Sequence, residues 1–292
     1  MQLHFLYPKI FLMKQKYTLH THTSGFDGKN TIAEMVACAR DMGFNTVGIS
    51  NHFIVHPNIK QSKMYPFSVH GGYSNIYASD FDEVLSRFIP HYAELDKIQA
   101  QTPDIKILRG MEVDFFDNSK WRTGFEKCIS ILKPDYIIGS CHFIEHNNTL
   151  LNSHDWQNAE SDFQDILLET YWANIARAAQ SGIFNWMAHL DLPKKAGIGQ
   201  SEKWAEHENI AVDVISKSGA AIEINTGHYR PYCYEPYPSN RILQMVSNYD
   251  IPVLISDDAH AVSQIGRHFD EAENLINQFK LKTYEPSTLT VK

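Results

Sequence analysis

The sequence contains few cysteines and no long hydrophobic run, and each shortage narrows the class of protein. Its four cysteines are far apart and form no CxxC pair: Cys38, Cys128, Cys141 and Cys233. We therefore expect neither a disulfide framework nor a zinc knuckle, but small buried side chains in the reducing cytoplasm. No segment approaches the roughly 20 apolar residues that cross a bilayer, so no membrane partner is expected either.

A surplus of positive charge is also missing. The chain has 26 lysines and arginines against 34 aspartates and glutamates, which gives a formal net charge of -8 at pH 7. Proteins that bind nucleic acid neutralise its phosphates with lysine and arginine. We therefore expect no nucleic-acid partner, whereas a small anionic ligand in a local pocket is compatible with this charge.

The first residues, MQLHFLYPKIFLMKQKY, are apolar but do not have the pattern of a signal peptide. No basic region precedes the apolar part, Pro8 and Lys9 interrupt it, and no small-residue cleavage site follows. We expect residues 1–16 to be an N-terminal extension and residues 17–292 to form a single domain. This length fits one large α/β barrel, and no repeat or linker divides it.

Short β-rich segments alternate with helical periodicity, which predicts parallel strands joined by right-handed crossovers. The segments cover residues 17–20, 46–50, 105–113, 136–142, 185–189, 221–225 and 253–256. Between two of them, residues 53–79 contain prolines, glycines and tyrosines without clear periodicity. We expect this stretch to be a long connection that acts as a lid.

Two helices have clear sequence signals. Thr31 and Glu34 have the spacing of a capping box, and Gly43 marks the end of the first helix. The second helix is expected over residues 160–180, with a buried stripe of Phe163, Ile166, Leu167, Thr170, Tyr171 and Ile175. Residues 237–239 (YPS) are expected to begin a later helix.

Potential metal ligands occur at the carboxyl ends of the predicted strands. His20 and His22 are two residues apart, so they point to the same face of an extended chain. The other candidates end or follow further strands: Asp27, His52, Glu112, His142, His189, Asp258 and His260. Because the carboxyl ends of the strands in a parallel barrel meet on one face, these side chains predict a metal site.

The ligand types indicate which metals fit and what they can do. Imidazole and carboxylate without thiolate suit Zn, Mn or Fe. So many ligands exceed the needs of one ion, and we expect two or three divalent ions that share carboxylates. Such a cluster generates hydroxide near neutral pH and holds the attacking and leaving oxygens of a phosphate ester.

An ordered set of motifs carries a family resemblance: HTHTSGFDGKNT, ISNHF, GMEVDF, GSCHF, AHLDLPKK, EINTGHYRPYCYEPYPS and SDDAH. In this order they resemble the polymerase and histidinol phosphatase (PHP) family, specifically its histidinol-phosphatase branch, over nearly all of residues 17–275. The resemblance implies a distorted (β/α)7 TIM-like barrel with a trinuclear metal centre at the carboxyl ends of the strands. It also implies hydrolysis of phosphate esters.

The resemblance further distributes the ligands by position. It assigns one ion to His20, His22, Glu112 and Asp258. It assigns a second ion to Asp27, His52 and His260. For the third ion it implies a bridge by Glu112, together with His142 and His189.

The residues expected to act on the substrate also follow from the resemblance. Arg230 and one of Lys194 and Lys195 would bind the phosphate, because a guanidinium fork or an ammonium group complements its oxygens. His228 is a further candidate for substrate binding. Asp191 would orient a ligand histidine or Lys195. The expected catalytic residues are thus Arg230, Asp191 and Lys195.

Some positions depart from the family pattern. Asn51 stands where the family usually carries an acidic residue, and Gly227 and His228 alter the phosphate-binding turn. The expected substrate is L-histidinol phosphate, which would place the enzyme in histidine biosynthesis. Another small phosphomonoester, a phosphotyrosine or a nucleotide is the alternative. A nucleic-acid-processing module, as in polymerase-attached members of the family, is disfavoured by the acidic net charge.

Overall fold

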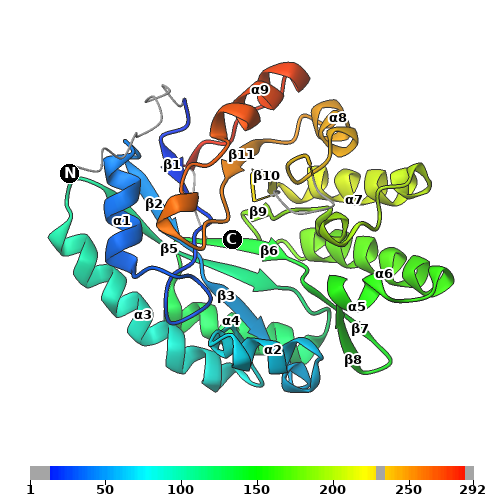
Figure 1. Ribbon diagram of the computed structural model, residues 1–292, viewed down its shortest axis with the longest axis horizontal. Coiled ribbons are helices and arrows are strands. Elements are labelled where there is room, and N and C mark those ends of the chain that lie inside the picture. The colour runs from blue at the N-terminus through cyan, green and yellow to red at the C-terminus, as the bar shows by residue number, and fades with distance from the viewer. Residues whose placement is uncertain (1–13, 228–233, 287–292) are drawn as a thin grey trace, which may run out of the picture.

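The computed structural model describes residues 14–227 and 234–286, which form a nearly closed barrel of parallel strands with helices around it (Figure 1). The barrel path runs β1, β2, β5, β6, β9, β10 and β11. These strands cover Tyr17–Thr18, Thr46–Ile49, Lys106–Asp114, Tyr136–Ser140, Trp186–Met187, Ala221–Asn225 and Val253–Ser256. The prediction of a seven-stranded α/β barrel is confirmed, with each strand at its expected place in the sequence.

The barrel closes between β1 and β11 through a few specific bonds. At the carboxyl ends, the backbone N–H of His22 donates to the carbonyl of Ala259 at 2.8 Å, and the Ala259 N–H donates to His20 at 3.1 Å. Just before β1, the side-chain amide of Gln15 bonds both the N–H and the carbonyl of Ile255 within β11. The closure therefore fixes the HxH pair against the segment that follows β11.

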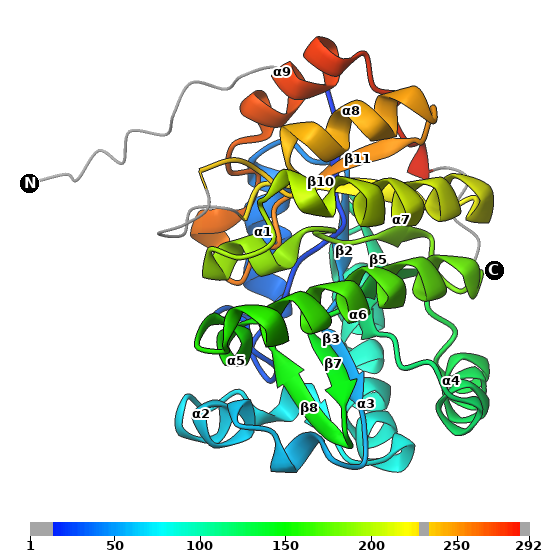
Figure 2. The same cartoon turned by 90° about the vertical axis from the view of Figure 1, so that its right-hand side faces the viewer.

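The helices lie outside the strands, as Figures 1 and 2 show. The longer ones are α1, α3, α4, α6, α7, α8 and α9, which cover Ile32–Asp41, Phe81–Gln101, Ser119–Leu132, Ser161–Gln180, Ala205–Ser218, Asn240–Asn248 and Phe269–Phe279. Short 3-10 turns cover Ile59–Gln61, Ser74–Ile76, Leu192–Ala196, Glu202–Trp204 and Val262–Gln264. No helix in residues 14–227 and 234–286 is both long and apolar enough to cross a membrane.

The predicted helix boundaries are largely confirmed. Thr31 and Glu34 form the complete capping box of α1, and Gly43 follows this helix with a φ of +88°. Ser239 is the N-cap of α8. One expectation within α6 is wrong, because the side chain of Ile166 is exposed rather than buried in the stripe.

The interpretation of residues 53–79 as an irregular connection is wrong. This region contains most of β3 (His52–Val55), together with α2 (Met64–His70) and β4 (Tyr77–Ala78). These elements are too short to show a period in the sequence. Pro66 also obscured α2, although a proline in the first turn of a helix interrupts no intrahelical bond.

A hairpin between β6 and α6 was also not predicted. It consists of β7 (Phe143–His146) and β8 (Thr149–Asn152), and α5 (Ser153–Gln157) follows it directly. Figure 2 shows the hairpin at the same end of the molecule as β3 and α2. The side chain of Asn58, in the segment between β3 and α2, donates to the carbonyl of Asn148 at the tip of the hairpin. The hairpin and this segment therefore stabilise one another.

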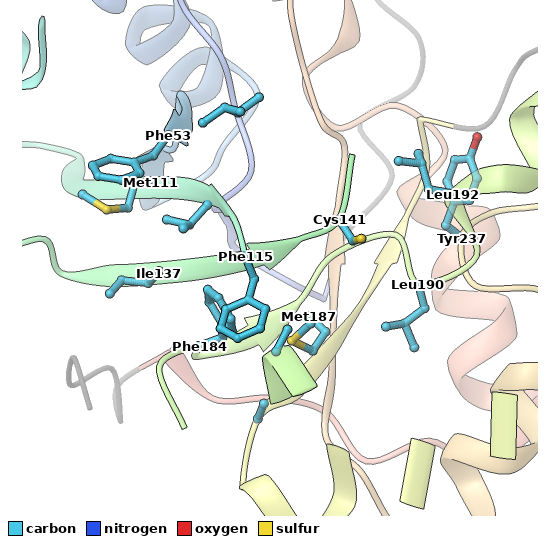
Figure 3. Close-up of a cluster of buried hydrophobic side chains, with 14 of the residues drawn as sticks. Phe53, Met111, Phe115, Ile137, Cys141, Phe184, Met187, Leu190, Leu192 and Tyr237 are labelled. Carbon is cyan, nitrogen blue, oxygen red and sulfur yellow. The ribbon is translucent and has the colours of Figure 1, made fainter. Parts of the chain in front are cut away.

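The barrel strands are buried on both faces. Figure 3 shows part of the layer between strands and helices, with Phe53, Met111, Ile137 and Met187. The inner face forms a second cluster: Leu19, Leu108, Tyr136, Ile138, Trp186, Ala188, Ala221 and Leu254. Among the described cysteines, Cys128 and Cys141 are buried and Cys38 is half-buried, whereas Cys233 lies outside the described residues.

Tyr136 fills the barrel interior because two neighbouring strands carry glycine beside it. Its hydroxyl donates to the carbonyl of Leu19 at 2.7 Å, and its ring stacks on Trp186. A Cβ atom at Gly48 would lie 2.1 Å from the Tyr136 hydroxyl oxygen, and one at Gly110 would lie 2.2 Å from the ring. The glycines therefore make room for the aromatic side chain.

We predict that Gly110→Ala destabilises the protein through this clash, by about 1–3 kcal/mol of unfolding free energy. Chemical denaturation of Gly110→Ala, Tyr136→Leu and the double variant measures the effect. The cost of the alanine should be smaller in the Tyr136→Leu background than in the parent, because the shorter side chain leaves space. Equal costs in both backgrounds would contradict the explanation.

Candidate metal centre

The structure brings all the predicted metal ligands together at the carboxyl end of the barrel. Their ligand atoms form overlapping groups of three or four, within which the atoms lie no more than 4.8 Å apart. The groups are His22, Asp27, His52 and His260; His20, His22 and Asp258; His20, Glu112 and His189; and His52, Glu112 and His142. Each predicted ligand belongs to at least one group.

Glu112 is the centre of this arrangement. It lies on β5, is 1% exposed, and pairs in register with His52 at the start of β3. Imidazole nitrogens surround its two oxygens at 2.8–3.6 Å, and they belong to His20, His22, His52, His142 and His189. Burial opposes ionisation of this carboxyl, but the facing imidazoles, led by His52 and His20, hold its pKa well below the usual range.

Two further carboxylates complete the cluster. Asp27, in the loop before α1, lies 3.1 Å from His52 Nε2 and 3.0 Å from His260 Nε2. Asp258, after β11, lies 3.2 Å from His22 Nε2. The site is therefore assembled from both ends of the chain, and the closure of the barrel between β1 and β11 brings them into contact.

The polar atoms of the cluster fit bound cations better than they fit one another. Several buried atoms make no hydrogen bond, including His20 Nε2, both ring nitrogens of His22, His52 Nδ1, Asp27 Oδ1 and Glu112 Oε2. A buried polar atom without a partner is costly, and such atoms converging on shared points are what a metal site requires. Imidazole and carboxylate without thiolate are the ligands expected for ions such as zinc.

Glu223 holds two of the candidate ligands in place and was missed in the sequence. Its Oε2 accepts a hydrogen bond from His20 Nδ1 at 2.8 Å, which leaves His20 Nε2 free to face Glu112. Its Oε1 accepts from the backbone N–H of His189 at 3.1 Å. The signal was a single charged residue within the buried strand AIEIN, β10.

Asp114 and Ser140 support the opposite side of the cluster. Asp114 accepts from both the backbone N–H and Nδ1 of His142, at 2.6 and 3.1 Å. The Ser140 hydroxyl donates to Glu112 Oε1 at 2.6 Å. Asp114 could have been found from the sequence, because it follows Glu112 by two residues in GMEVDF and so shares its face of the strand.

The turn that follows His22 is held by Asn51 and Gly28. Asn51 accepts from the backbone N–H of Thr23 and donates to the Thr23 hydroxyl and to His91 Nε2. Burial lowers the pKa of His91 to about 4, which keeps this imidazole neutral and able to accept. A Cβ atom at Gly28 would lie 2.5 Å from the backbone of His22, so only glycine lets the loop approach so closely.

Two of the candidate ligands have unusual backbone conformations. His189 and Asp258 have φ angles of 22° and 47°, in the left-handed region that residues other than glycine rarely occupy. Glu223 binds the backbone of His189, and Arg267 donates to the carbonyls of Asp257 and Asp258. Strain of this kind is typical of functional sites, where surrounding contacts maintain it.

The residues expected at the substrate occupy different environments. Lys194 is 3% exposed, pairs with Asp191 at 3.0 Å and donates to the carbonyl of Pro236 at 2.6 Å. Asp191 also accepts from the N–H of Ser239, so both residues anchor the start of α8. Neither of them lines the cavity that lies beside the cluster of candidate ligands. Lys195, in contrast, lines the cavity. Arg230 and His228 lie outside the described residues.

The cavity beside the cluster has a volume of about 200 Å³. Apart from candidate ligands, its wall is formed mainly by Ile54, Met64, Ile76, Tyr77, Phe143, Asn152, Ser153, Leu192, Lys195, Gly227 and Tyr237. A larger cavity of about 600 Å³ lies at the amino ends of β1, β2 and β5, against residues such as Tyr17 and Lys106. None of the candidate metal ligands lines this larger cavity. The smaller cavity beside the cluster is therefore the candidate reactive cavity, although it is not the larger of the two.

We predict that the protein binds divalent metal and that Glu112→Gln loses most of it, because Glu112 belongs to two ligand groups. Elemental analysis after dialysis measures the metal. Saturating Zn²⁺ should also raise the melting temperature of the parent, since a ligand of the folded state stabilises it. Glu208→Gln is the control, because Glu208 is equally buried but pairs with Arg241 away from the cluster. Full metal content in Glu112→Gln would refute the assignment.

We predict that Glu223→Gln weakens metal binding by about 10–100-fold, the usual effect of removing a group that orients a metal-bound histidine. The amide cannot accept from both His20 and the backbone of His189 with two oxygens, as the carboxylate does. Competition with a chelator of known affinity measures the loss, again with Glu208→Gln as the control. Unchanged affinity would show that Glu223 is dispensable.

Comparison with known proteins agrees with this geometry. The family model described as "PHP domain" matches residues 16–227. A protein of Deinococcus radiodurans named as a probable histidinol-phosphatase is 31% identical over 193 residues, which are 63% of this chain and 70% of that protein. The histidinol-phosphatase of Saccharomyces cerevisiae is 24% identical to this chain. The match covers 88% of this chain and 87% of the yeast protein.

A solved structure shares the fold. Histidinol phosphate phosphatase from Lactococcus lactis, complexed with zinc, L-histidinol and phosphate, superposes with a TM-score of 0.62 at 16% identity. The match covers 94% of this chain and 99% of that one. The motif order, the barrel and the matching family model lead to one conclusion. This chain belongs to the PHP domain family.

Proposed function

We propose that this protein is a metal-dependent phosphomonoesterase that hydrolyses L-histidinol phosphate to L-histidinol and phosphate. The observation that carries the proposal is the buried Glu112 carboxylate among imidazoles from several strand ends, beside a small cavity. The named histidinol-phosphatases among the relatives support this substrate.

We further propose that the clustered ligands hold two or three divalent ions, with Zn, Mn or Fe as the candidates. One ion would be held by His20, His22, Glu112 and Asp258, and a second by Asp27, His52 and His260. Glu112 would also help to hold a third, together with His142 and His189. When bound, such ions activate water for attack on phosphorus and neutralise the charge of the phosphate.

The chain's own residues would position the substrate. Lys195 lines the cavity and would bind the phosphoryl oxygens, as would Arg230. His228 would contact the remainder of the substrate. Asp191 would act indirectly through the loop that carries Lys195. The ester P–O bond breaks, water adds to phosphorus, and the alcohol leaves with a proton.

We also propose the domain boundaries, the pathway, the cellular location and the partners of the protein. Residues 17–292 would form one phosphatase domain preceded by an extension of residues 1–16. The reaction would belong to histidine biosynthesis in the cytoplasm, with a small phosphorylated molecule as the partner and no nucleic acid or membrane.

The alternative keeps the chemistry and changes the substrate to another small phosphomonoester, a phosphotyrosine or a nucleotide. The reason to retain it is the altered turn at Gly227, a residue that lines the cavity. This turn lies where the family binds phosphate, so a change there affects which esters fit.

A comparison of kcat/KM across phosphate esters tests the proposal. Purified protein loaded with Zn²⁺ or Mn²⁺ is assayed with L-histidinol phosphate, phosphotyrosine and AMP. We expect histidinol phosphate to be preferred by at least about tenfold, which corresponds to about 1.4 kcal/mol of transition-state binding. Glu112→Gln should be inactive toward every ester. A preference for one of the other esters would favour the alternative, and no phosphate release at all would reject a phosphatase.

A further inference from the structure

Tyr77 lies in the wall of the reactive cavity because of the register between β3 and β4. Tyr77 on β4 pairs with Ile54 on β3, so the two side chains share one face. His52 precedes Ile54 by two residues and points to that face as well. His52, Ile54 and Tyr77 all line the cavity. The short strand β4 therefore places a tyrosine on the same wall as a candidate metal ligand.

Backbone hydrogen bonds and a neighbouring aromatic ring hold Tyr77 in position. Its backbone N–H donates to Ser74, and its carbonyl accepts from the Arg87 guanidinium at 2.8 Å. Its ring packs edge-on against Phe143, with centroids 5.8 Å apart. The side chain is thus held by the backbone and by a neighbouring ring before any ligand arrives, which lowers the cost of binding.

Within residues 14–227 and 234–286 the hydroxyl of Tyr77 makes no hydrogen bond, and the residue as a whole is only 4% exposed. Its oxygen is not among the fully buried polar atoms that lack a partner, so the hydroxyl is accessible from the cavity that Tyr77 lines. Burial, together with the nearby carboxylate of Asp114, raises the pKa of the phenol, so it is a neutral donor. Among the described residues that line the cavity, Lys195 is the one lysine or arginine, so neutral donors matter for an anionic ligand.

We propose that the Tyr77 hydroxyl donates a hydrogen bond to a non-bridging phosphoryl oxygen of the substrate. Tyr77 shares its wall with His52, against which the phosphoryl group would lie when the metals are bound. The inference rests on the proposed phosphatase function. It adds a substrate-contacting residue from the insertion between β2 and β5, outside the seven barrel strands.

Tyr77→Phe tests this role, because it removes only the hydroxyl. The dissociation constant of inorganic phosphate for the metal-loaded protein, measured by calorimetry, should rise about tenfold or more, as for other hydrogen bonds to charged groups. The value of kcat/KM should fall by a similar factor for histidinol phosphate and for p-nitrophenyl phosphate, since both present the same phosphoryl group. Metal content should be unchanged.

Tyr65→Phe is the matched control. The Tyr65 ring lies 6.3 Å from that of Tyr77, but Tyr65 does not line the cavity, so its variant should match the parent. An unchanged phosphate affinity in Tyr77→Phe, a loss confined to histidinol phosphate, or a fall in metal content would each overturn the inference. If the parent does not hydrolyse histidinol phosphate but binds phosphate through Tyr77, the proposed substrate is wrong and the inference stands.

Discussion

A carboxylate almost completely shielded from water sits among imidazoles at the carboxyl end of the barrel, and the rest of the site is arranged around it. Glu112 lies within 3.6 Å of ring nitrogens of His52, at the start of β3, and of histidines that follow β1, β6 and β9. An isolated ionised carboxylate would be very costly there, so it depends on positive neighbours. Bound cations answer that need more fully than imidazoles, because the ring nitrogens of His20, His22 and His52 that face Glu112 are left without hydrogen-bond partners.

This requirement explains why the barrel closes as it does. The bonds between His20, His22 and Ala259 join the two ends of the strand path just where these two histidines meet Asp258 and His260. The contacts that close the barrel are thus also the contacts that bring these ligands together. A shift of one residue in this contact would turn the HxH pair away from the other ligands, since strand side chains alternate between faces.

A layer of buried polar residues gives the cluster its geometry. Glu223 and Asp114 bind the ring nitrogens of His20 and His142 that do not face Glu112, and Asn51 fixes the turn after His22. These contacts select which nitrogen of each ring is available to a cation. They also hold the left-handed backbone of His189, so the site is positioned by the fold before it binds metal or substrate.

The sequence alone determined the positions of the barrel strands, the α/β class and the set of candidate metal ligands, because buried strands and their polar carboxyl ends leave a local pattern. It did not reveal Glu223, whose role depends on a contact with His20 from the other end of the chain. It also did not reveal that Lys194 pairs with Asp191, or that Tyr77 lies beside Ile54 and His52. Those facts depend on register and on pairing between distant segments. A local pattern specifies which face a residue occupies, but only the closed barrel decides what lies opposite it.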